Sequence, residues 1–306
     1  MIHSLLMLVA GGVLLYYGAE WMVRGGSRLA GKLGVSPLVI GLTVVAFGTS
    51  LPELMVSLVA AINGKEAIAI GNVVGSNIAN VGLVLGLSSL IFPITVVYRT
   101  IGRELWIYLG VAIVFILFCY DGMIERWEGI LLFSGLIAYV WMHIKYPPDC
   151  VEEPETNFGT IPRNILILLL GISLLTFGAD LFVRGAVAVA TQMGISEIVI
   201  GMTVVALGTS LPELATSVVA AFRKQSGISI GNIVGSNLFN ILSVIGLVSI
   251  IRPLQVDPAI LNLELPLMLA FGVALFPIAR MVQPIPRPAT AVLLISYIGI
   301  MIWMFI

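Results

Sequence analysis

The chain of 306 residues is 59% hydrophobic and only 10% charged, and its mean hydropathy is +1.11. Soluble domains carry about 25% charged residues, so most of this surface must face lipid. The 15 basic and 16 acidic residues nearly cancel, which argues against a nucleic-acid-binding surface. Two cysteines in unrelated surroundings exclude a disulfide framework. We expect an integral membrane protein that contacts the lipid bilayer, with no nucleic acid and no protein partner implied.

Charges and prolines divide the apolar sequence into about ten segments, most of them close to the roughly 20 residues that a membrane-spanning helix needs. In chain order the predicted cores are Leu5–Met22, Val35–Ile62, Ile68–Val97, Leu105–Tyr120, Ile130–Trp141, Ile165–Val183, Ile198–Phe222, Ile228–Ile251, Leu265–Ala279 and Ala289–Ile306. The stretch between the fifth and sixth cores is rich in proline and glutamate. Its composition is typical of a linker outside the membrane.

The two halves of the chain share an internal repeat. Residues 41–60 match residues 201–220 at 15 of 20 positions. The sequence GNVVGSNIAN at 71–80 matches GNIVGSNLFN at 231–240. Both matches have the same offset along the chain, without a gap between them. The second half is therefore a copy of the first.

This repeat predicts the fold class. If each half holds five crossings, which is an odd number, the second half must enter the membrane from the opposite side. We predict an all-α membrane protein in which residues 1–145 and 164–306 form two inverted five-helix repeats, with a polar linker at 146–163. Transporters built in this way have broken helices and a substrate site near the middle of the membrane.

The basic residues of the connections predict the orientation. With the N-terminus outside, the inner loops and ends carry eleven basic residues, namely Arg24, Arg28, Lys32, Arg99, Arg103, Lys145, Arg163, Arg223, Lys224, Arg280 and Arg287. Only four lie outside, namely Lys65, Arg126, Arg184 and Arg252. Because basic residues favour the cytoplasmic side, we expect both termini outside.

Two glutamates are the acidic residues deepest in the apolar segments, namely Glu53 and Glu213, whereas Glu20 and Asp180 lie towards the ends of theirs. An ionisable group at that depth marks an ion or proton path by default. The alternative is a structural glutamate that is paired with an arginine or kept protonated. Because the glutamate recurs in both repeats and no basic residue lies beside it in either segment, we favour ion binding.

The glutamates follow the sequence GTSLP in both repeats. Proline has no N–H and disfavours a helical turn before it, so the helix should break there. Carbonyls freed by the break must face protein, water or a cation. Oxygen ligands of this kind suit Ca²⁺ and disfavour zinc or copper. The predicted ligands are the carbonyls of Ala46 and Ala206 and the side chains of Thr49, Ser50, Glu53, Thr209, Ser210 and Glu213.

The second repeated motif is uncharged but rich in side-chain oxygens. Ser76 and Asn80 are four residues apart, as are Ser236 and Asn240, so each pair can face one cavity. We interpret these four residues as ligands or neighbours of ligands, with interhelical hydrogen bonding as the alternative. The glycines of the same motif are interpreted as helix-packing residues.

The paired GTSLPE and GNxxGSN segments, in inverted halves separated by a loop, resemble the alpha repeats of the sodium/calcium exchanger family within the cation/calcium exchangers. The resemblance covers nearly the whole chain and carries all twelve predicted ligands. It implies a Na⁺/Ca²⁺ antiporter with one Ca²⁺ between the glutamates, Na⁺ in flanking sites and no prosthetic group. It also implies that the first and sixth helices slide across the remaining bundle to alternate access.

The resemblance further implies a multi-pass protein of a cell membrane, of the prokaryotic type. Family members that also transport K⁺ are similar but carry Asp where Asn240 stands. Because Asn80 and Asn240 are both neutral here, we expect transport that does not depend on K⁺.

Two other kinds of transporter and an enzyme are alternatives to this interpretation. A Ca²⁺/H⁺ antiporter is the main alternative because buried glutamates can exchange protons, although the Thr, Ser and Asn residues suit Na⁺ better. A cation channel is a weaker alternative because carboxylates can line a pore. We expect no enzymatic activity, since Ser50 and Ser210 have no nearby His or Lys base and the chain has no HExxH motif.

Overall fold

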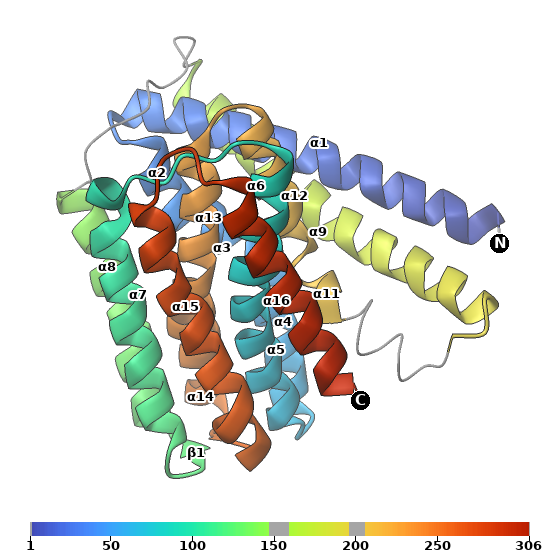
Figure 1. Ribbon diagram of the computed structural model, residues 1–306, viewed down its shortest axis with the longest axis vertical. Coiled ribbons are helices and arrows are strands. Elements are labelled where there is room, and N and C mark those ends of the chain that lie inside the picture. Colours follow the sequence, from blue (N-terminus) through green and yellow to red (C-terminus); the bar gives the residue numbers. More distant parts are fainter. Residues whose placement is uncertain (1, 147–158, 196–205, 306) are drawn as a thin grey trace.

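The computed structural model describes residues 2–146, 159–195 and 206–305, which are predominantly helical (Figure 1). The first half contains α1 (Ile2–Leu33), α2 (Pro37–Ile40), the π-helical turn η1 (Gly41–Val45), α3 (Ala46–Thr49), α4 (Leu51–Ile62), α5 (Glu66–Ala79), η2 (Asn80–Leu85), α6 (Gly86–Ile91), α7 (Tyr98–Cys119) and α8 (Arg126–Lys145). The second contains α9 (Ile161–Gln192), α11 (Ala206–Gly208), α12 (Leu211–Phe222), α13 (Ser226–Phe239), η4 (Asn240–Ile245), α14 (Gly246–Ile251), η5 (Ile260–Glu264), α15 (Leu265–Arg280) and α16 (Arg287–Phe305). Two short strands, β1 (Met123–Ile124) and β2 (Leu254–Gln255), pair antiparallel, a small departure from the predicted all-α class.

Seven of the described helices are long and apolar enough to cross a membrane, and the bent pair Pro37–Thr49 and Leu51–Ile62 makes up to eight. Two further apolar helices, Leu211–Phe222 and Arg287–Trp303, are shorter. The start of the predicted Ile198–Phe222 core falls outside the described residues. The segments thus follow the predicted order, whereas the total of ten crossings stays a prediction.

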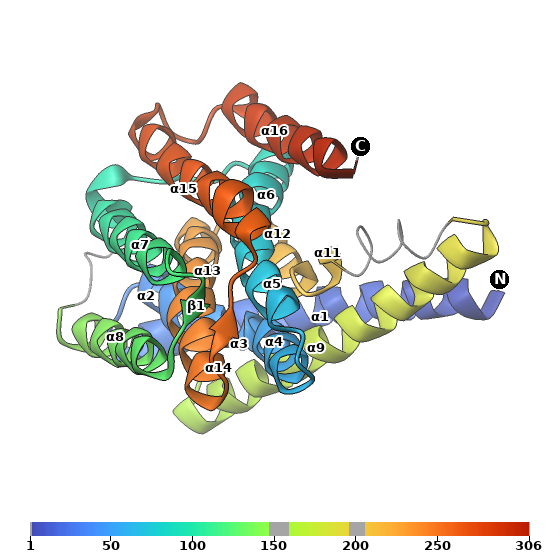
Figure 2. The same ribbon diagram turned by 90° about the horizontal axis from the view of Figure 1, so that it is seen from below.

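The centre of the bundle is formed by α13, which packs against α2, η1, α3, α7 and α12 (Figure 2). Its glycines allow the backbones to approach closely. A Cβ atom at Gly231 would lie 2.8 Å from the Leu38 carbonyl oxygen, and one at Gly235 would lie 2.7 Å from that of Leu42. These two glycines are therefore helix-packing residues, as predicted. The prediction is wrong for their equivalents Gly71 and Gly75, where a Cβ atom would meet nothing within 4 Å.

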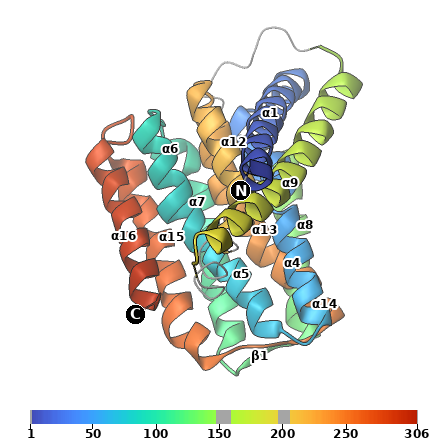
Figure 3. The same cartoon turned by 90° about the vertical axis from the view of Figure 1, so that its right-hand side faces the viewer.

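Helices α1 and α9 lie side by side along one flank, away from α15 and α16 (Figures 2 and 3). Glycines at seven-residue intervals on each helix face the backbone of the other helix, namely Gly11, Gly18, Gly25, Gly171, Gly178 and Gly185. A Cβ atom at Gly18 would lie 2.7 Å from the Leu175 backbone nitrogen. Because only glycine permits this spacing, the antiparallel pair forms one continuous close contact.

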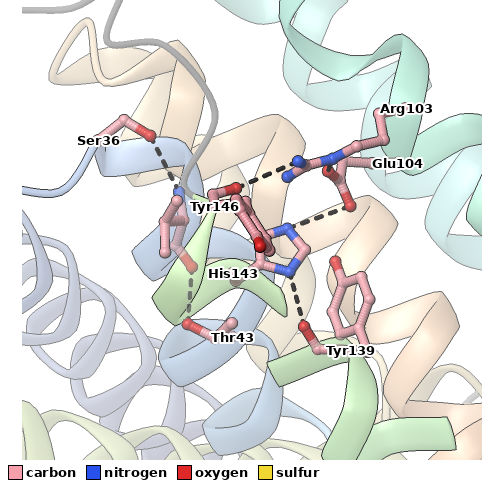
Figure 4. A network of polar contacts seen from close by, with 8 residues as sticks. Ser36, Thr43, Arg103, Glu104, Tyr139, His143 and Tyr146 are labelled. Atoms are coloured by element: carbon pink, nitrogen blue, oxygen red, sulfur yellow. Dashed lines mark hydrogen bonds and ion pairs between the residues drawn. The ribbon is translucent and has the colours of Figure 1, made fainter. Parts of the chain in front are cut away.

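A polar cluster that the sequence did not reveal joins α7 to α8 (Figure 4). Glu104 and His143 are fully buried, and His143 Nε2 lies 3.1 Å from Glu104 Oε2. Arg103 Nε binds the other carboxyl oxygen of Glu104 at 2.9 Å. His143 Nδ1 faces the carbonyl of Tyr139 at 3.0 Å, so both ring nitrogens face oxygen acceptors. Glu104 is thus a third fully buried glutamate, which corrects the expectation that Glu53 and Glu213 are the only deeply buried ones.

The glycine contact predicts a position-dependent effect of an added methyl group. Gly18→Ala should destabilise the protein by about 1–3 kcal/mol, because α1 and α9 must separate to admit the Cβ atom. Gly12→Ala is the matched control, since a Cβ atom there meets nothing within 4 Å and alanine favours helix. Thermal unfolding in detergent measures both variants. Equal unfolding temperatures for the two would contradict the close contact.

The buried ion pair predicts a different stability effect. His143→Leu should destabilise the protein by about 3 kcal/mol, because the buried Glu104 carboxyl group loses one of its two side-chain partners. His3→Leu is the control, because His3 is exposed and its replacement should change stability by no more than about 0.5 kcal/mol. The same unfolding assay applies, and a His143→Leu variant as stable as the control would show that the pair contributes nothing.

Candidate cation-binding site

The helix break predicted within GTSLPE is present in both repeats. Ser50 lies between α3 and α4 with φ −82° and ψ 2°, and the two helical pieces are bent by 41°. Ser210 has φ −85° and ψ 2° before α12. The breaks place Glu53 and Glu213 in the first turns of α4 and α12. At that position the positive end of the helix dipole favours a negative charge.

Both glutamate side chains are fully buried. Ser76 Oγ donates a hydrogen bond of 3.4 Å to Glu53 Oε1. Among the described residues, Glu53 Oε2 and both carboxyl oxygens of Glu213 have no hydrogen-bond partner. The described basic residues form their ion pairs with other acidic residues. The alternative of a structural glutamate paired with an arginine therefore finds no support in this part of the chain.

Hydroxyl groups from the two repeats meet beside these carboxyl groups. Thr49 Oγ1 lies 3.1 Å from Ser236 Oγ. Ser210 Oγ donates to Ser76 Oγ over 3.4 Å. Each contact joins a residue of the first repeat to one of the second, so neither repeat forms this site alone.

Asn80 and Asn240 are fully buried and begin the π-helical turns η2 and η4. Asn80 Nδ2 donates to Asn237 Oδ1 at 3.0 Å, and Asn240 Nδ2 donates to Asn77 Oδ1 at 3.1 Å. The Oδ1 atoms of Asn80 and Asn240 have no partner in the described structure. The amide nitrogens therefore make the interhelical hydrogen bonds of the alternative interpretation, while the role of the oxygens as ligands stays a prediction.

The predicted site residues supply six buried oxygens without a hydrogen-bond partner among the described residues. They are Ser50 Oγ, Glu53 Oε2, Asn80 Oδ1, Glu213 Oε1, Glu213 Oε2 and Asn240 Oδ1. Unpartnered buried acceptors are unfavourable, and carboxylate, amide and hydroxyl oxygens are the ligands that hard cations such as Ca²⁺ prefer. The described residues hold no cluster of three or more His, Cys, Asp or Glu side chains that could hold a metal ion.

The carbonyl of Ala46 differs from the prediction. Its oxygen accepts a backbone hydrogen bond from Ser50 at 3.0 Å and lies 3.3 Å from Thr49 Oγ1, so the break does not leave it unsatisfied. The reason is that Ser50 retains its N–H, whereas Pro52 loses the one that Gly48 would have used. Ala206 begins α11, but its side chain falls outside the described residues.

Two further asparagines belong to the site and were not singled out in the sequence. Asn72 Oδ1 accepts a hydrogen bond of 3.3 Å from Thr209 Oγ1, and Asn232 Oδ1 accepts one of 3.0 Å from Thr49 Oγ1. They occupy equivalent positions in the repeated GNxxGSN motif. The repeat identifies them as equivalent, but only the fold brings each one to the threonine of the other repeat.

Known proteins resemble this chain over nearly its full length. The family model described as sodium/calcium exchanger protein matches residues 3–145 and 163–306. The chain is 33% identical to sodium/calcium exchanger MaX1 of Methanosarcina acetivorans, across 99% of this chain and 98% of that protein. It is 34% identical to inner membrane protein YrbG of Escherichia coli, across 99% and 96%.

A solved structure of the sodium-calcium exchanger NCX_Mj, soaked with zero Na⁺ and Ca²⁺, has a TM-score of 0.87 to this chain. The two are 34% identical, and the match covers 99% of each. Human sodium/potassium/calcium exchanger 2 matches over 103 residues, 33% of this chain and 16% of that protein, at 38% identity. The chain therefore belongs to the sodium/calcium exchanger family of multi-pass membrane transporters.

Proposed function

We propose that this protein is a Na⁺/Ca²⁺ antiporter in which the Na⁺ gradient drives Ca²⁺ transport. The observation that carries the proposal is the set of buried, unpartnered oxygens around Glu53 and Glu213. The names of MaX1 and NCX_Mj agree with it. Two carboxylates neutralise one Ca²⁺, while the neutral hydroxyl, amide and carbonyl oxygens can each contribute to coordinating Na⁺.

In this proposal Ca²⁺ lies between Glu53 and Glu213, and Na⁺ occupies flanking sites. The remaining ligands are Thr49, Ser50, Ser76, Asn80, Thr209, Ser210, Ser236 and Asn240 with the carbonyls of Ala46 and Ala206. The ligands come from both repeats, so relative movement of the repeats changes access to the ion. That property supports an antiporter over a channel, in which the pathway stays open at both ends.

Residues 1–145 and 164–306 then form inverted repeats of five crossings each, with residues 146–163 as the linker. Helices α1 and α9 occupy equivalent positions in the two repeats and share the glycine contact. We expect them to move together across the rest of the bundle to alternate access. Transport should not require K⁺, because Asn80 and Asn240 add no third negative charge to the site.

Ca²⁺ uptake into proteoliposomes tests the proposal. An outward Na⁺ gradient should drive uptake, and K⁺ should not be required. Glu53→Gln and Glu213→Gln should each lower uptake at least about 100-fold, because Ca²⁺ would keep an uncompensated charge in a low-dielectric site. Glutamine is nearly isosteric, so folding should be preserved.

The controls separate the alternatives. Glu66→Gln removes a glutamate from the helix end, where it pairs with Arg252, and should leave uptake close to wild type. Uptake driven equally well by a pH gradient without Na⁺ would indicate a Ca²⁺/H⁺ antiporter. Near-normal Na⁺-driven uptake in either glutamine variant would make the glutamates structural.

The proposed orientation, with both termini outside the cell membrane, rests on the distribution of basic residues, and the alternation of the loops between two faces that it requires is supported by how the loops group. The Arg252 side chain donates to the Ile62 carbonyl at 3.2 Å, and β1 pairs with β2, so three predicted outer loops meet. The predicted inner loops also meet, because Thr95 N donates to Ser226 Oγ at 3.1 Å and Val96 N donates to Gln283 Oε1 at 2.8 Å.

Cysteine labelling tests the orientation. In a variant whose native cysteines are replaced by alanine, Lys65→Cys should react with an impermeant maleimide in intact cells. Lys224→Cys, at an exposed loop of the opposite group, should react only after permeabilisation. The reverse pattern would place both termini in the cytoplasm, contrary to the distribution of basic residues.

A further inference from the structure

The Asn232 amide links the two repeats beside the proposed ion site. Its Nδ2 donates to the Glu213 carbonyl oxygen at 3.3 Å and to Ser217 Oγ at 3.0 Å. Its Oδ1 accepts from Thr49 Oγ1 at 3.0 Å, and the Asn232 side chain is fully buried. Asn232 therefore connects the glutamate helix of its own repeat to a threonine of the other repeat.

Asn72 makes the same contacts with the repeats exchanged. Its Nδ2 donates to the Glu53 carbonyl oxygen at 3.2 Å and to Ser57 Oγ at 3.0 Å. Its Oδ1 accepts from Thr209 Oγ1 at 3.3 Å. Three hydrogen bonds thus recur at equivalent positions of the two repeats, which indicates a built arrangement rather than incidental packing.

The chemistry of these contacts determines the orientation of each amide. A main-chain carbonyl such as that of Glu213 can only accept a hydrogen bond, so the amide end that faces it must be the NH₂ group. The other end of Asn232, which faces Thr49, must then be the oxygen, and it also can only accept. Among the three oxygens within hydrogen-bond distance of Thr49 Oγ1, Asn232 Oδ1 is the nearest, at 3.0 Å, and we take it as the acceptor of the single hydroxyl proton.

The direction of that proton matters for a cation ligand. A hydroxyl coordinates a cation through an oxygen lone pair, with its proton pointing away. Thr49 Oγ1 also lies 3.3 Å from the Ala46 carbonyl oxygen and 3.1 Å from Ser236 Oγ, and both residues are proposed ligands. A proton directed at either would occupy an oxygen that the cation needs. Asn232 keeps the proton away from both.

We propose that Asn232 and Asn72 are positioning residues that draw the hydroxyl protons of Thr49 and Thr209 away from the cation. Each threonine then presents its lone pairs to the ion. The proposal rests on the proposed function, in which both threonines are ligands. Only an amide can both accept the threonine proton and donate to the main-chain carbonyl of the glutamate. An ionised aspartate would accept from the threonine but could not donate to that carbonyl.

A double-mutant cycle tests the proposal in the full-length protein. The readout is counterflow of labelled Ca²⁺ into Ca²⁺-loaded proteoliposomes, because this exchange does not require Na⁺ coupling. Thr49→Val and Asn232→Ala should each raise the Ca²⁺ concentration for half-maximal exchange about tenfold. The double variant should lie within about twofold of either single variant, since the acceptor no longer has a proton to receive.

The matched control combines two substitutions that affect different threonines. Asn232→Ala combined with Thr209→Val should raise the half-maximal concentration about 100-fold, because these residues act through different hydroxyls. Asn232→Asp retains an acceptor for the Thr49 proton, so Thr49→Val should still have about a tenfold effect in that background. This second comparison applies even if Asn232→Ala fails to fold.

The outcomes distinguish the two proposals. Independent effects of Thr49→Val and Asn232→Ala would overturn the positioning role and leave Thr49 as a ligand. An unchanged half-maximal concentration in Thr49→Val would overturn both roles. Absence of Na⁺-driven uptake in the wild type, together with coupled effects in counterflow, would reject Na⁺ coupling while the positioning role stands.

Discussion

Two buried carboxyl groups without basic partners set the main energetic constraint on this structure. Glu53 and Glu213 are fully buried, and the described basic residues pair elsewhere. An isolated carboxylate in a low-dielectric interior is unfavourable by several kcal/mol or more. Helix N-termini and hydroxyl groups offset only part of this free energy. In the proposed function a bound cation supplies the remaining charge, so the site and its ion would be parts of one arrangement.

The constraint also explains why the repeat is visible in the sequence. Each repeat provides one carboxylate at one helix break. Both breaks have the same local sequence, with Pro52 two residues after Ser50 and Pro212 two residues after Ser210, and this sequence positions both carboxylates. Local rules of this kind were sufficient to predict the breaks and the oxygen-bearing residues. They could not predict the Ala46 carbonyl contacts, because those depend on how the turn at Ser50 closes.

The contacts between the two repeats could not be predicted from the sequence. Equivalence within the repeat says that Asn72 corresponds to Asn232, but not that each reaches the threonine of the opposite repeat. Glu104 and His143 are harder still, because they lie far apart in the sequence and pair across two helices without any repeat signal. The hydropathy pattern also predicted too short a first helix. Helix α1 extends to Leu33, past Glu20 and Arg24, because these two charged side chains pair with each other.

The repeats differ most clearly where α1 meets α12. Glu20 is buried and pairs with Arg223 at the end of α12 as well as with Arg24 on its own helix. Its counterpart Asp180 is exposed and pairs with Arg184 of the same helix, and Asn63 stands where an equivalent of Arg223 would be. Among the described residues, the contact of α1 with α12 therefore contains an ion pair between helices, whereas the equivalent contact of α9 with α4 does not. Because separating a buried carboxylate from one of its partners is unfavourable, this contact favours the described arrangement over one in which α1 has moved away from α12.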